Sequence, residues 1–397
     1  WDTEIKRAQE RGLDGYPVFT RKAMTDLNYV ACARKLLALR PRLFPQFATH
    51  NALTVATLLE LADGGGFEFQ RLHGMGDALY TQLAKDRPDI AYRTYAPVGS
   101  HRDLLAYLVR RLLENGANSS FVALAADDTV PVQSLLRRPA DIIGSADNAR
   151  HPNIPLPQDL YRPQRRNSRG IEFGERAALG KLVASVAAET VPGAVRVADA
   201  TPESAHAAIG AAQTGFSGWS RMPAERRATI LDRAAELLEQ RAAHFIALLQ
   251  REGGKTLDDA VSEVREAIDF CRYYAVQGRT LFGEGEAMPG PTGESNMLAL
   301  RGRGVFVAIS PWNFPLAIFL GQVVAALMAG NSVVAKPAEQ TPLIAAEAVR
   351  LLQEAGLPAS ALQLVQGDGR IGAALVAHPG IAGVVFTGST KVARAIN

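Results

Sequence analysis

Cysteine is scarce in this sequence, which has only Cys32 and Cys271 in 397 residues. Two cysteines cannot build a disulfide framework or a cysteine-rich zinc site, so we expect the protein to work in a reducing compartment. Both fall in predicted helices among apolar neighbours, where we expect inert core residues rather than nucleophiles. The sequence also lacks an apolar run of the roughly 18–20 residues that a membrane-spanning helix needs.

A large excess of charge of one sign is missing as well. The chain has 43 Lys and Arg against 40 Asp and Glu, a formal net charge of +3, which is too mild to indicate nucleic-acid binding. No signal peptide is recognisable, because the first residues, WDTEIKRAQERG, are charged. The chain opens on Trp1 rather than Met and stops at Asn397 inside a predicted helix, so we expect both ends to be cut.

The first part of the chain alternates short β-like runs with amphipathic helical segments. The β-like runs are Tyr16–Thr20, Phe44–Thr49, Phe67–Leu72 and Tyr92–Ala96, and the helical segments are Asp26–Leu39, Leu53–Ala62, Asp77–Lys85 and Asp103–Glu114. This alternation predicts a parallel sheet with helical crossovers. Its spacing is close to that of a (β/α)8 (TIM) barrel, and four strands would make a partial barrel with open edges.

The sequence pattern changes between residues 127 and 174, where prolines and arginines are scattered and hydrophobic periodicity is lost. A structureless segment of this length inside one domain would be unusual, so we interpret residues 127–174 as a proline-rich linker. The predicted domains are therefore residues 1–126 and residues 175–397. The second begins with helices and then alternates VFVAIS, NSVVAKP, LQLVQ and GVVFTGS with further helices. That pattern predicts an α/β domain with a doubly wound nucleotide-binding sheet.

Polar residues in the first domain follow the predicted strands. At the strand ends stand Thr20, Arg21, Lys22, Thr49, His50, Gln70, Leu72 and Tyr95. One face of the helix near residues 100–117 carries Tyr107, Arg110, Arg111 and Glu114, a donor array suited to a carboxylate or phosphate. By pattern alone, a solvated face with an Arg–Glu pair is the favoured interpretation. The strand ends favour an anion site, because function in a barrel gathers at the carboxyl ends of the strands.

In the second domain, candidate residues also follow strands. Lys336 and Glu339 can bind ribose hydroxyls, and Gly388 and Ser389 open a helix whose free N–H groups can face a pyrophosphate. Asn313, in the turn after a strand, can donate to an oxyanion, although turn chemistry alone also explains it. The string from Gly367 to Gly372 matches G-x-G-x-x-G, but the acidic residue of the ordinary fingerprint is missing. No metal site is predicted, since no carboxylate accompanies a histidine at ligand spacing.

The strings ISPWNFP, AGNSVVAKPAEQTP and FTGST resemble the NAD-binding half of an aldehyde dehydrogenase, and FSGWSRMPAERRATILDRAAELLE and GGKTLDDAVSEVREAIDF resemble its amino-terminal helices. The strings YPVFTRK, PQFATHNA, FEFQRLHGMG and YAPVGSHRDLLAYLVRRLLENGANSSFV resemble the flavin-binding barrel of proline dehydrogenase. Both in one chain resemble the proline utilization A family of bifunctional bacterial enzymes. The fold implied is a partial (β/α)8 barrel, a linker and a partial aldehyde-dehydrogenase-type doubly wound NAD-binding domain.

The resemblance implies oxidation of L-proline by FAD, with hydride passing to the flavin and the imine hydrolysing to glutamate semialdehyde, which NAD then oxidises to L-glutamate. It assigns the proline to Arg110, Arg111, Tyr95, Tyr107 and Leu72. It assigns FAD to Trp1, Thr20, Arg21, Lys22, Thr49, His50, Gln70 and Glu114. It assigns NAD to Ser310, Trp312, Lys336, Glu339, Gly369, Gly388 and Ser389, and the oxyanion hole to Asn313. The catalytic Cys and Glu of the family are expected after Asn397, and the early barrel strands before Trp1.

The resemblance also implies substrate channeling, a quinone or other electron acceptor, and a cytoplasmic protein. It leaves open a homo-oligomer and peripheral contact with the inner face of the membrane. Three other readings stay open: an aldehyde dehydrogenase fused to a barrel for a different substrate, a DNA-binding autorepressor of proline catabolism, and a non-catalytic scaffold. DNA contact would need a module before Trp1.

Overall fold

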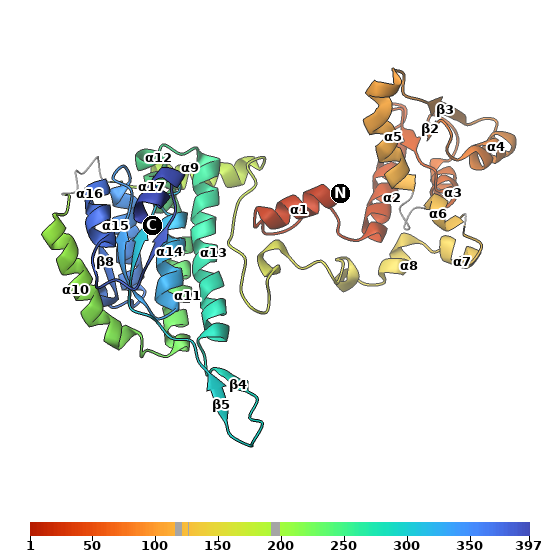
Figure 1. Ribbon diagram of the computed structural model, residues 1–397. Coiled ribbons are helices and arrows are strands. Elements are labelled where there is room, and N and C mark those ends of the chain that lie inside the picture. The colour runs from red at the N-terminus through yellow and green to blue at the C-terminus, as the bar shows by residue number, and fades with distance from the viewer. Residues whose placement is uncertain (116–120, 126, 192–198) are drawn as a thin grey trace. The chain divides into compact units, whose positions relative to one another are not determined.

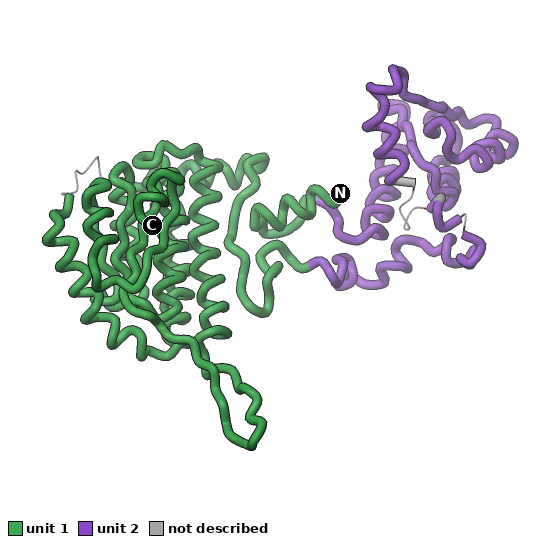
Figure 2. The backbone as a smooth tube through the Cα atoms, viewed as in Figure 1, with its two compact units in different colours: residues 1–17, 155–397 green, residues 18–154 purple. Residues whose placement is uncertain are grey.

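The computed structural model describes residues 1–115, 121–125, 127–191 and 199–397, apart from the side chains of residues 114, 115 and 122. The chain forms two compact units, which Figure 2 distinguishes. One is residues 18–154, and the other combines residues 1–17 with residues 155–397. Each unit holds a parallel sheet with helical crossovers, so the predicted α/β class is confirmed.

The unit of residues 18–154 is built on a three-stranded parallel sheet in the order β1-β2-β3. The strands are β1 (Gln46–Ala48), β2 (Glu68–Leu72) and β3 (Ala91–Tyr95). The helices are α2 (Lys22–Ala38), α3 (Ala52–Ala62), α4 (Asp77–Asp86), α5 (His101–Asn115), α6 (Phe121–Ala125), α7 (Val132–Leu135) and α8 (Pro139–Ile143), with a short 3-10 turn η1 (Ala146–Asn148). Parallel pairing places the carboxyl ends of all three strands at one edge of the sheet.

The core of this unit is aromatic. The rings of Phe67 and Phe69 meet edge to face at 5.5 Å between centroids, and Phe47 lies 5.8 Å from Phe67. Leu58 of α3 and Tyr80 of α4 are fully buried against the same cluster. Phe47 and Phe69 are register partners in adjacent strands, so their side chains project to the same face of the sheet.

Two local predictions for this part of the chain are wrong. Residues 16–20 form bends and irregular backbone rather than a strand, and helix α2 already begins at Lys22. Pro17 offers no backbone N–H, which weakens any strand through this position.

Cys32 is exposed, because it falls on the outward side of α2 while Ala33 and Leu37 face the core. Cys271 is buried as predicted, and burial raises the pKa of its thiol to about 12.

The other unit carries a four-stranded parallel sheet in the order β8-β7-β6-β9 and a two-stranded antiparallel hairpin. Its strands are β4 (Glu286–Met288), β5 (Asn296–Leu298), β6 (Val305–Ile309), β7 (Ser332–Lys336), β8 (Leu362–Leu364) and β9 (Gly383–Phe386). Its helices are α1 (Asp2–Glu10), η2 (Pro157–Asp159), α9 (Arg176–Ala187), α10 (Pro202–Trp219), α11 (Ala224–Gln240), α12 (Ala242–Glu252), α13 (Leu257–Leu281), α14 (Ala317–Met328), α15 (Pro342–Glu354), η3 (Ala359–Ala361), α16 (Gly369–Val376) and α17 (Thr390–Ile396).

The four-stranded sheet is covered on both faces, as the doubly wound prediction requires (Figure 1). Successive side chains of β6 point to opposite faces. Val305 and Val307 pack with α10 and α16, whereas Ala308 packs with the layer that contains α11, α13 and α14. Strand β7 is buried at all five positions, which explains the apolar run VVA in its middle.

The predicted linker is anchored from Pro155 onward. The Asn167 side-chain amide donates to the carbonyls of Gln9 and Pro157, both at 3.1 Å. The Ser168 hydroxyl donates to the Asp269 carboxylate at 2.6 Å. These bonds tie residues 155–170 to α1 and α13 within one unit. Whether the domain boundaries fall at residues 126 and 174 stays a prediction.

Among the residues that the structure describes, no helix combines the length and apolar character that crossing a membrane requires. In the same residues, no group of three or more His, Cys, Asp or Glu side chains is arranged to hold a metal ion.

Gly215 of α10 makes a close approach that only glycine allows. A Cβ built there would lie 2.1 Å from the backbone oxygen of Ser360, which cannot move without shifting η3. We therefore expect Gly215→Ala to lower the free energy of unfolding by about 1–3 kcal/mol, as overpacking of a well-packed core does. Urea unfolding followed by circular dichroism measures the change.

Two glycines of the same helix provide matched controls. A Cβ at Gly210 or Gly218 meets no atom within 4 Å. Either Gly→Ala change should be neutral or stabilise the protein by up to about 1 kcal/mol, because alanine favours the helix. Equal unfolding midpoints for the Gly215, Gly210 and Gly218 variants would contradict the packing argument.

Candidate active sites

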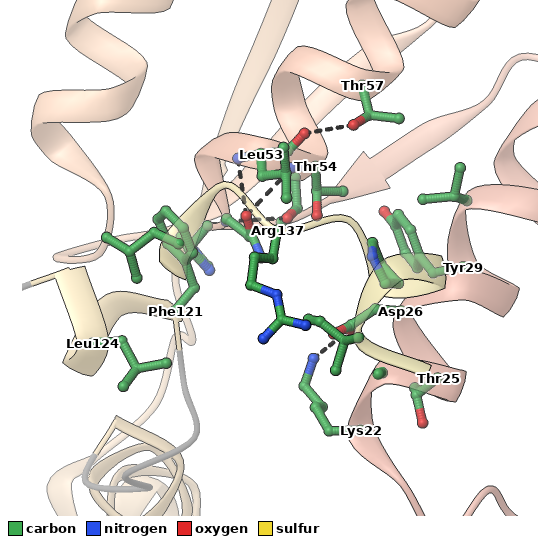
Figure 3. Close-up of a pocket in the computed structure, with 18 of the residues that line it drawn as sticks. Lys22, Thr25, Asp26, Tyr29, Leu53, Thr54, Thr57, Phe121, Leu124 and Arg137 are labelled. Carbon is green, nitrogen blue, oxygen red and sulfur yellow. Dashed lines mark hydrogen bonds and ion pairs between the residues drawn. The ribbon is translucent and has the colours of Figure 1, made fainter. Parts of the chain in front are cut away.

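A pocket of about 580 Å³ lies at the carboxyl edge of the three-stranded sheet. Lys22, Thr49, His50, Leu72 and Arg111, all predicted site residues, line it. They come from α2, from the ends of β1 and β2, and from α5, so the structure brings together segments far apart in the sequence. Figure 3 shows α2 residues on one side, α3 residues above and the segment around Phe121 opposite.

His50 is held as a hydrogen-bond acceptor at this edge. Its Nε2 accepts from the Leu72 backbone N–H at 3.1 Å, so the neutral ring carries its proton on Nδ1. Burial lowers the pKa of His50, and the positive charges of Arg71 and Arg111 lower it further. The ring is therefore neutral at pH 7 and fixes the end of β2, where Leu72, a predicted substrate-site residue, stands.

Thr49 is fixed through its backbone. The Tyr80 hydroxyl lies 2.7 Å from the Thr49 carbonyl and 3.0 Å from the Gln70 carbonyl, so it joins the ends of β1 and β2. Burial raises the pKa of Tyr80, which keeps the hydroxyl protonated as a donor. Asn51 then caps α3 by accepting from the N–H groups of Leu53 and Thr54.

The side chain of Gln70 belongs to a network around Glu68. Glu68 is buried, and it accepts from Gln46 at 2.8 Å and from Gln70 at 3.0 Å. Arg93 of β3 donates to both of its oxygens, at 3.0 and 2.9 Å. The bond from Arg93 is the largest cause that lowers the pKa of Glu68 to about 2. Sequence reasoning missed Glu68, although a glutamate between two phenylalanines in FEFQRL was a signal for a buried ion pair.

Thr20 and Arg21 bind the segment of residues 142–151, near the carboxyl end of this unit. The Thr20 hydroxyl is buried and accepts from the His151 N–H at 3.0 Å. The Arg21 guanidinium donates to the Ile142 carbonyl at 3.0 Å and also to the Asn148 carbonyl. Lys22 forms an ion pair with Asp26 at the pocket wall. The contacts of these three residues with FAD stay predictions.

Only some of the predicted proline-binding residues line the pocket. Arg111 lines the pocket and its guanidinium lies 5.2 Å from the centroid of the Tyr107 ring, one helical turn earlier. Arg110 and Tyr95 are exposed and are not among the pocket-lining residues that the structure describes. The side chain of Glu114 lies outside the described residues. Trp1, predicted for FAD, precedes α1 in the other unit and is exposed.

Arg137 is a pocket residue that sequence reasoning assigned to the linker. It lies in the middle of the pocket view in Figure 3. The only sequence signal was the pair Arg137-Arg138 next to a proline, which is equally typical of a solvated loop. Tyr29 and Thr54 also line the pocket and were not predicted.

The second site lies at the carboxyl edge of the four-stranded sheet. The chain runs from β6 outward to β7 and β8, and then returns to pair β9 with the other side of β6. The carboxyl ends of β6 and β9 therefore form the topological switch point, where open α/β sheets bind nucleotides. Ser310, Trp312 and Asn313 follow β6, and Gly388 and Ser389 follow β9, so the structure brings these predicted residues to one edge.

Ser310 is the clearest sign of a polar ligand at this edge. Its backbone N–H donates to the Lys336 carbonyl at 3.2 Å, which extends the sheet. Its hydroxyl is buried and has no hydrogen-bond partner in the described part of the chain. Buried hydroxyls are nearly always paired, so a polar group of a bound ligand fits here.

Lys336 is buried at the end of β7. Its Nζ donates to the carbonyls of Pro337 at 2.9 Å and Gly367 at 2.7 Å, and burial lowers its pKa. The lysine therefore joins the end of β7 to the segment that follows β8. Glu339 is exposed three residues later. Contacts of either residue with a ribose stay predictions.

The two predicted helix starts are capped. Asp368 accepts from the Arg370 N–H at 2.9 Å, directly before Gly369 opens α16. Ser389 caps α17 by accepting from the Val392 N–H at 3.3 Å. A Cβ at Gly388 would lie 2.6 Å from the end of the Phe386 ring, so a larger residue here would displace that ring.

Comparison with known proteins decides the family. The profile of the aldehyde dehydrogenase family matches residues 181–397, which is more than half of the chain. The chain belongs to the aldehyde dehydrogenase family. The proline dehydrogenase profile matches residues 1–124. Both resemblances predicted from the sequence motifs are confirmed.

This aldehyde dehydrogenase family member also resembles longer proteins. It is 47% identical to the bifunctional protein PutA of Rhizobium meliloti, over all of this chain and 34% of that protein. A crystal structure of proline utilization A from Bradyrhizobium japonicum is 78% identical, with a TM-score of 0.95 over all of this chain and 40% of that one. A 1-pyrroline-5-carboxylate dehydrogenase from Thermus, with bound NAD, is 32% identical, with a TM-score of 0.54 over 58% of this chain and 51% of that one. The chain thus spans about a third of the length of the curated bifunctional relatives.

Proposed function

We propose that the protein carrying this chain oxidises L-proline to L-glutamate in two steps, and that the chain provides part of each active site. The observation that carries the proposal is the likeness to bifunctional proline utilization A over the whole chain at 78% identity. Two candidate sites in one chain, each at the carboxyl edge of a parallel sheet, agree with two activities.

In the first site, Arg111 binds the carboxylate of proline and Leu72 packs against its apolar ring. A guanidinium matches a carboxylate in shape and charge, and the Tyr107 ring beneath Arg111 restricts its orientation. His50 stays neutral, so it adds no positive charge to the pocket beside Arg71 and Arg111. When bound, FAD supplies the acceptor for the hydride that leaves the proline ring.

The residues lining the pocket fit a flavin in part. The pocket combines a cation at Lys22, hydroxyls at Thr49 and Thr54, and apolar side chains such as Leu53 and Ile142. A large ligand with a charged phosphate part and a flat apolar part needs this mixture. The assignments of Thr20, Arg21, Gln70, Glu114 and Trp1 to FAD remain proposals.

In the second site, Asn313 donates its side-chain N–H to the oxygen of the aldehyde as negative charge develops there. The buried hydroxyl of Ser310, which has no partner among the residues that the structure describes, fits a polar group of a dinucleotide. When bound, NAD supplies the second hydride acceptor. Lys336, Glu339 and Trp312 are proposed to border it, and Gly369, Gly388 and Ser389 allow its close approach.

Partners and location follow from the same proposal. Proline and glutamate semialdehyde are the substrates, and a quinone or similar acceptor takes the electrons from the flavin. A cytoplasmic location, contact with the inner face of the membrane, a homo-oligomer and channeling between the sites remain predictions.

The full-length protein tests both activities separately. We expect the purified protein to show flavin absorbance that is bleached by L-proline, and to reduce NAD when glutamate semialdehyde is added directly. Protein without flavin bands would contradict the first activity. A failure to form NADH from the semialdehyde would contradict the second. Faster bleaching by another cyclic imino acid than by proline would favour a barrel with a different substrate.

A further inference from the structure

A buried ion pair lies against the loop that carries Asn313. Glu263 of α13 has a fully buried side chain, and its Oε2 lies 2.7 Å from Nζ of Lys255, which is itself 11% exposed. The other carboxylate oxygen accepts from the backbone N–H of Leu316 at 2.8 Å and of Ala317 at 3.2 Å. The carboxylate therefore binds the first turn of α14, immediately after the loop.

The same pair also contacts the loop through Lys255. Its Nζ lies 4.0 Å from the centroid of the Phe314 ring, a cation–π geometry. Phe314 follows Asn313 directly, and Leu316 comes two residues later. One ion pair thus fixes the chain at two points on the carboxyl side of Asn313.

Local sequence cannot supply this fixation. Helix α14 begins with Leu316 as its N-cap, and no side chain of its own loop caps it. The first N–H groups of a helix need acceptors, and a negative charge at that end is favoured by the helix dipole. Glu263 meets both needs from a different helix, 53 residues earlier in the chain.

Stability alone is a weak reason to bury such a pair. A buried salt bridge is often no more stabilising than well-packed apolar side chains of the same size. This ion pair instead restricts the position of the loop. The Glu263 carboxylate holds two backbone N–H groups, and the Lys255 ammonium contacts the Phe314 ring, so the loop can move little without losing these contacts. A displacement of about 1 Å of a catalytic group can lower a rate about 10²-fold.

We propose that Glu263, paired with Lys255, is a positioning residue that aims the Asn313 amide at the reacting oxygen. The inference rests on the proposed aldehyde oxidation at this site and assigns to Glu263 no contact with substrate or cofactor. It predicts that the effect of changing Glu263 depends on the presence of Asn313.

The test is a double-mutant cycle in the full-length protein, with kcat for semialdehyde oxidation as the readout. We expect Glu263→Gln to lower kcat about 10- to 100-fold in the wild-type background. In the Asn313→Ala background we expect the same change to have less than about a threefold further effect, because residues acting as a unit are not additive. Equal losses in both backgrounds, or a wild-type kcat for Glu263→Gln, would overturn the proposal.

Two further variants keep the test decisive. Glu284→Gln removes the same charge from an exposed position beyond the end of α13, and kcat should stay near wild type. Phe314→Leu removes the ring contact with Lys255 from a residue that is 39% exposed, so it decides the question if Glu263→Gln does not fold. We expect Phe314→Leu to lower kcat several-fold in the wild-type background and to have no further effect in the Asn313→Ala background. Additive losses would count against the proposal.

The proline-oxidising activity of the same polypeptide measures the amount of intact enzyme in each preparation, and circular dichroism checks that each variant is folded. Wild-type protein that does not oxidise the semialdehyde would defeat the proposed function itself. Active wild-type protein with additive mutations would defeat only the role of Glu263.

Discussion

Asn313→Ala is expected to lower kcat for semialdehyde oxidation by about 10²- to 10³-fold in the full-length protein, as the loss of one oxyanion donor does in other enzymes. Asn313 is exposed at the carboxyl end of β6, next to the switch point of the sheet. Its amide has room to donate to a ligand there. Because the donor acts mainly in the transition state, the KM for NAD should change little. Steady-state kinetics with varied semialdehyde and varied NAD measure both quantities.

An asparagine elsewhere in the same unit provides the matched control. Asn296 lies on the β4–β5 hairpin, which protrudes from this unit in Figure 1. Asn296→Ala makes the same chemical change away from the carboxyl edge of the four-stranded sheet, so kcat should stay near the wild-type value. A near-wild-type rate for Asn313→Ala would remove this residue from the oxyanion hole. A large rise in the KM for NAD would instead assign it to cofactor binding.

Arg111→Met is expected to raise the KM for L-proline by about 30- to 1000-fold. The change removes a charge-assisted bond to the substrate carboxylate, worth roughly 2–4 kcal/mol where the partner charge is left unpaired. Methionine keeps much of the apolar volume of the side chain, so the pocket should not collapse. Proline-dependent reduction of a dye acceptor gives KM and kcat. Arg110→Met should act in the same direction, because the resemblance assigns both guanidinium groups to the carboxylate.

Arg102→Met is the control for this change. Arg102 is exposed near the start of the same helix α5 and does not line the pocket. Its replacement should leave the KM for proline within about twofold of wild type, as expected for an exposed charge. An unchanged KM for Arg111→Met would exclude Arg111 from the substrate site. A loss of bound flavin without a change in KM would assign the residue to the cofactor.

Much of the second site could be predicted from the sequence. The alternation of short apolar runs with helices predicted a doubly wound sheet, and residues directly after its strands had to reach the same edge. Ser310 and Asn313 after β6 and Ser389 after β9 therefore come together as expected. This inference works because the period of the pattern fixes the element, and parallel pairing fixes which ends of the strands meet.

Other features depended on contacts between distant segments and could not be predicted. Local pattern favoured a strand at residues 16–20, yet these residues form bends and irregular backbone. Helical periodicity suggested a buried Cys32, but the neighbours of α2 bury Ala33 and Leu37 instead. The burial of Glu68 depends on Arg93 from the adjacent strand, and that of Glu263 depends on Lys255 and on the start of α14.

The sequence by itself determined the two kinds of parallel α/β unit and the order of their strands along the chain. It also determined which polar residues stand at the strand ends, because periodicity and turn residues are local properties. Only the tertiary structure decided that His50 accepts from Leu72, that Lys336 joins two strand ends, and that Glu263 supports the loop of Asn313. Each of these contacts joins residues at least 22 positions apart. The environment of such a charge or hydrogen bond is set by whichever segments pack around it, and no local pattern records that.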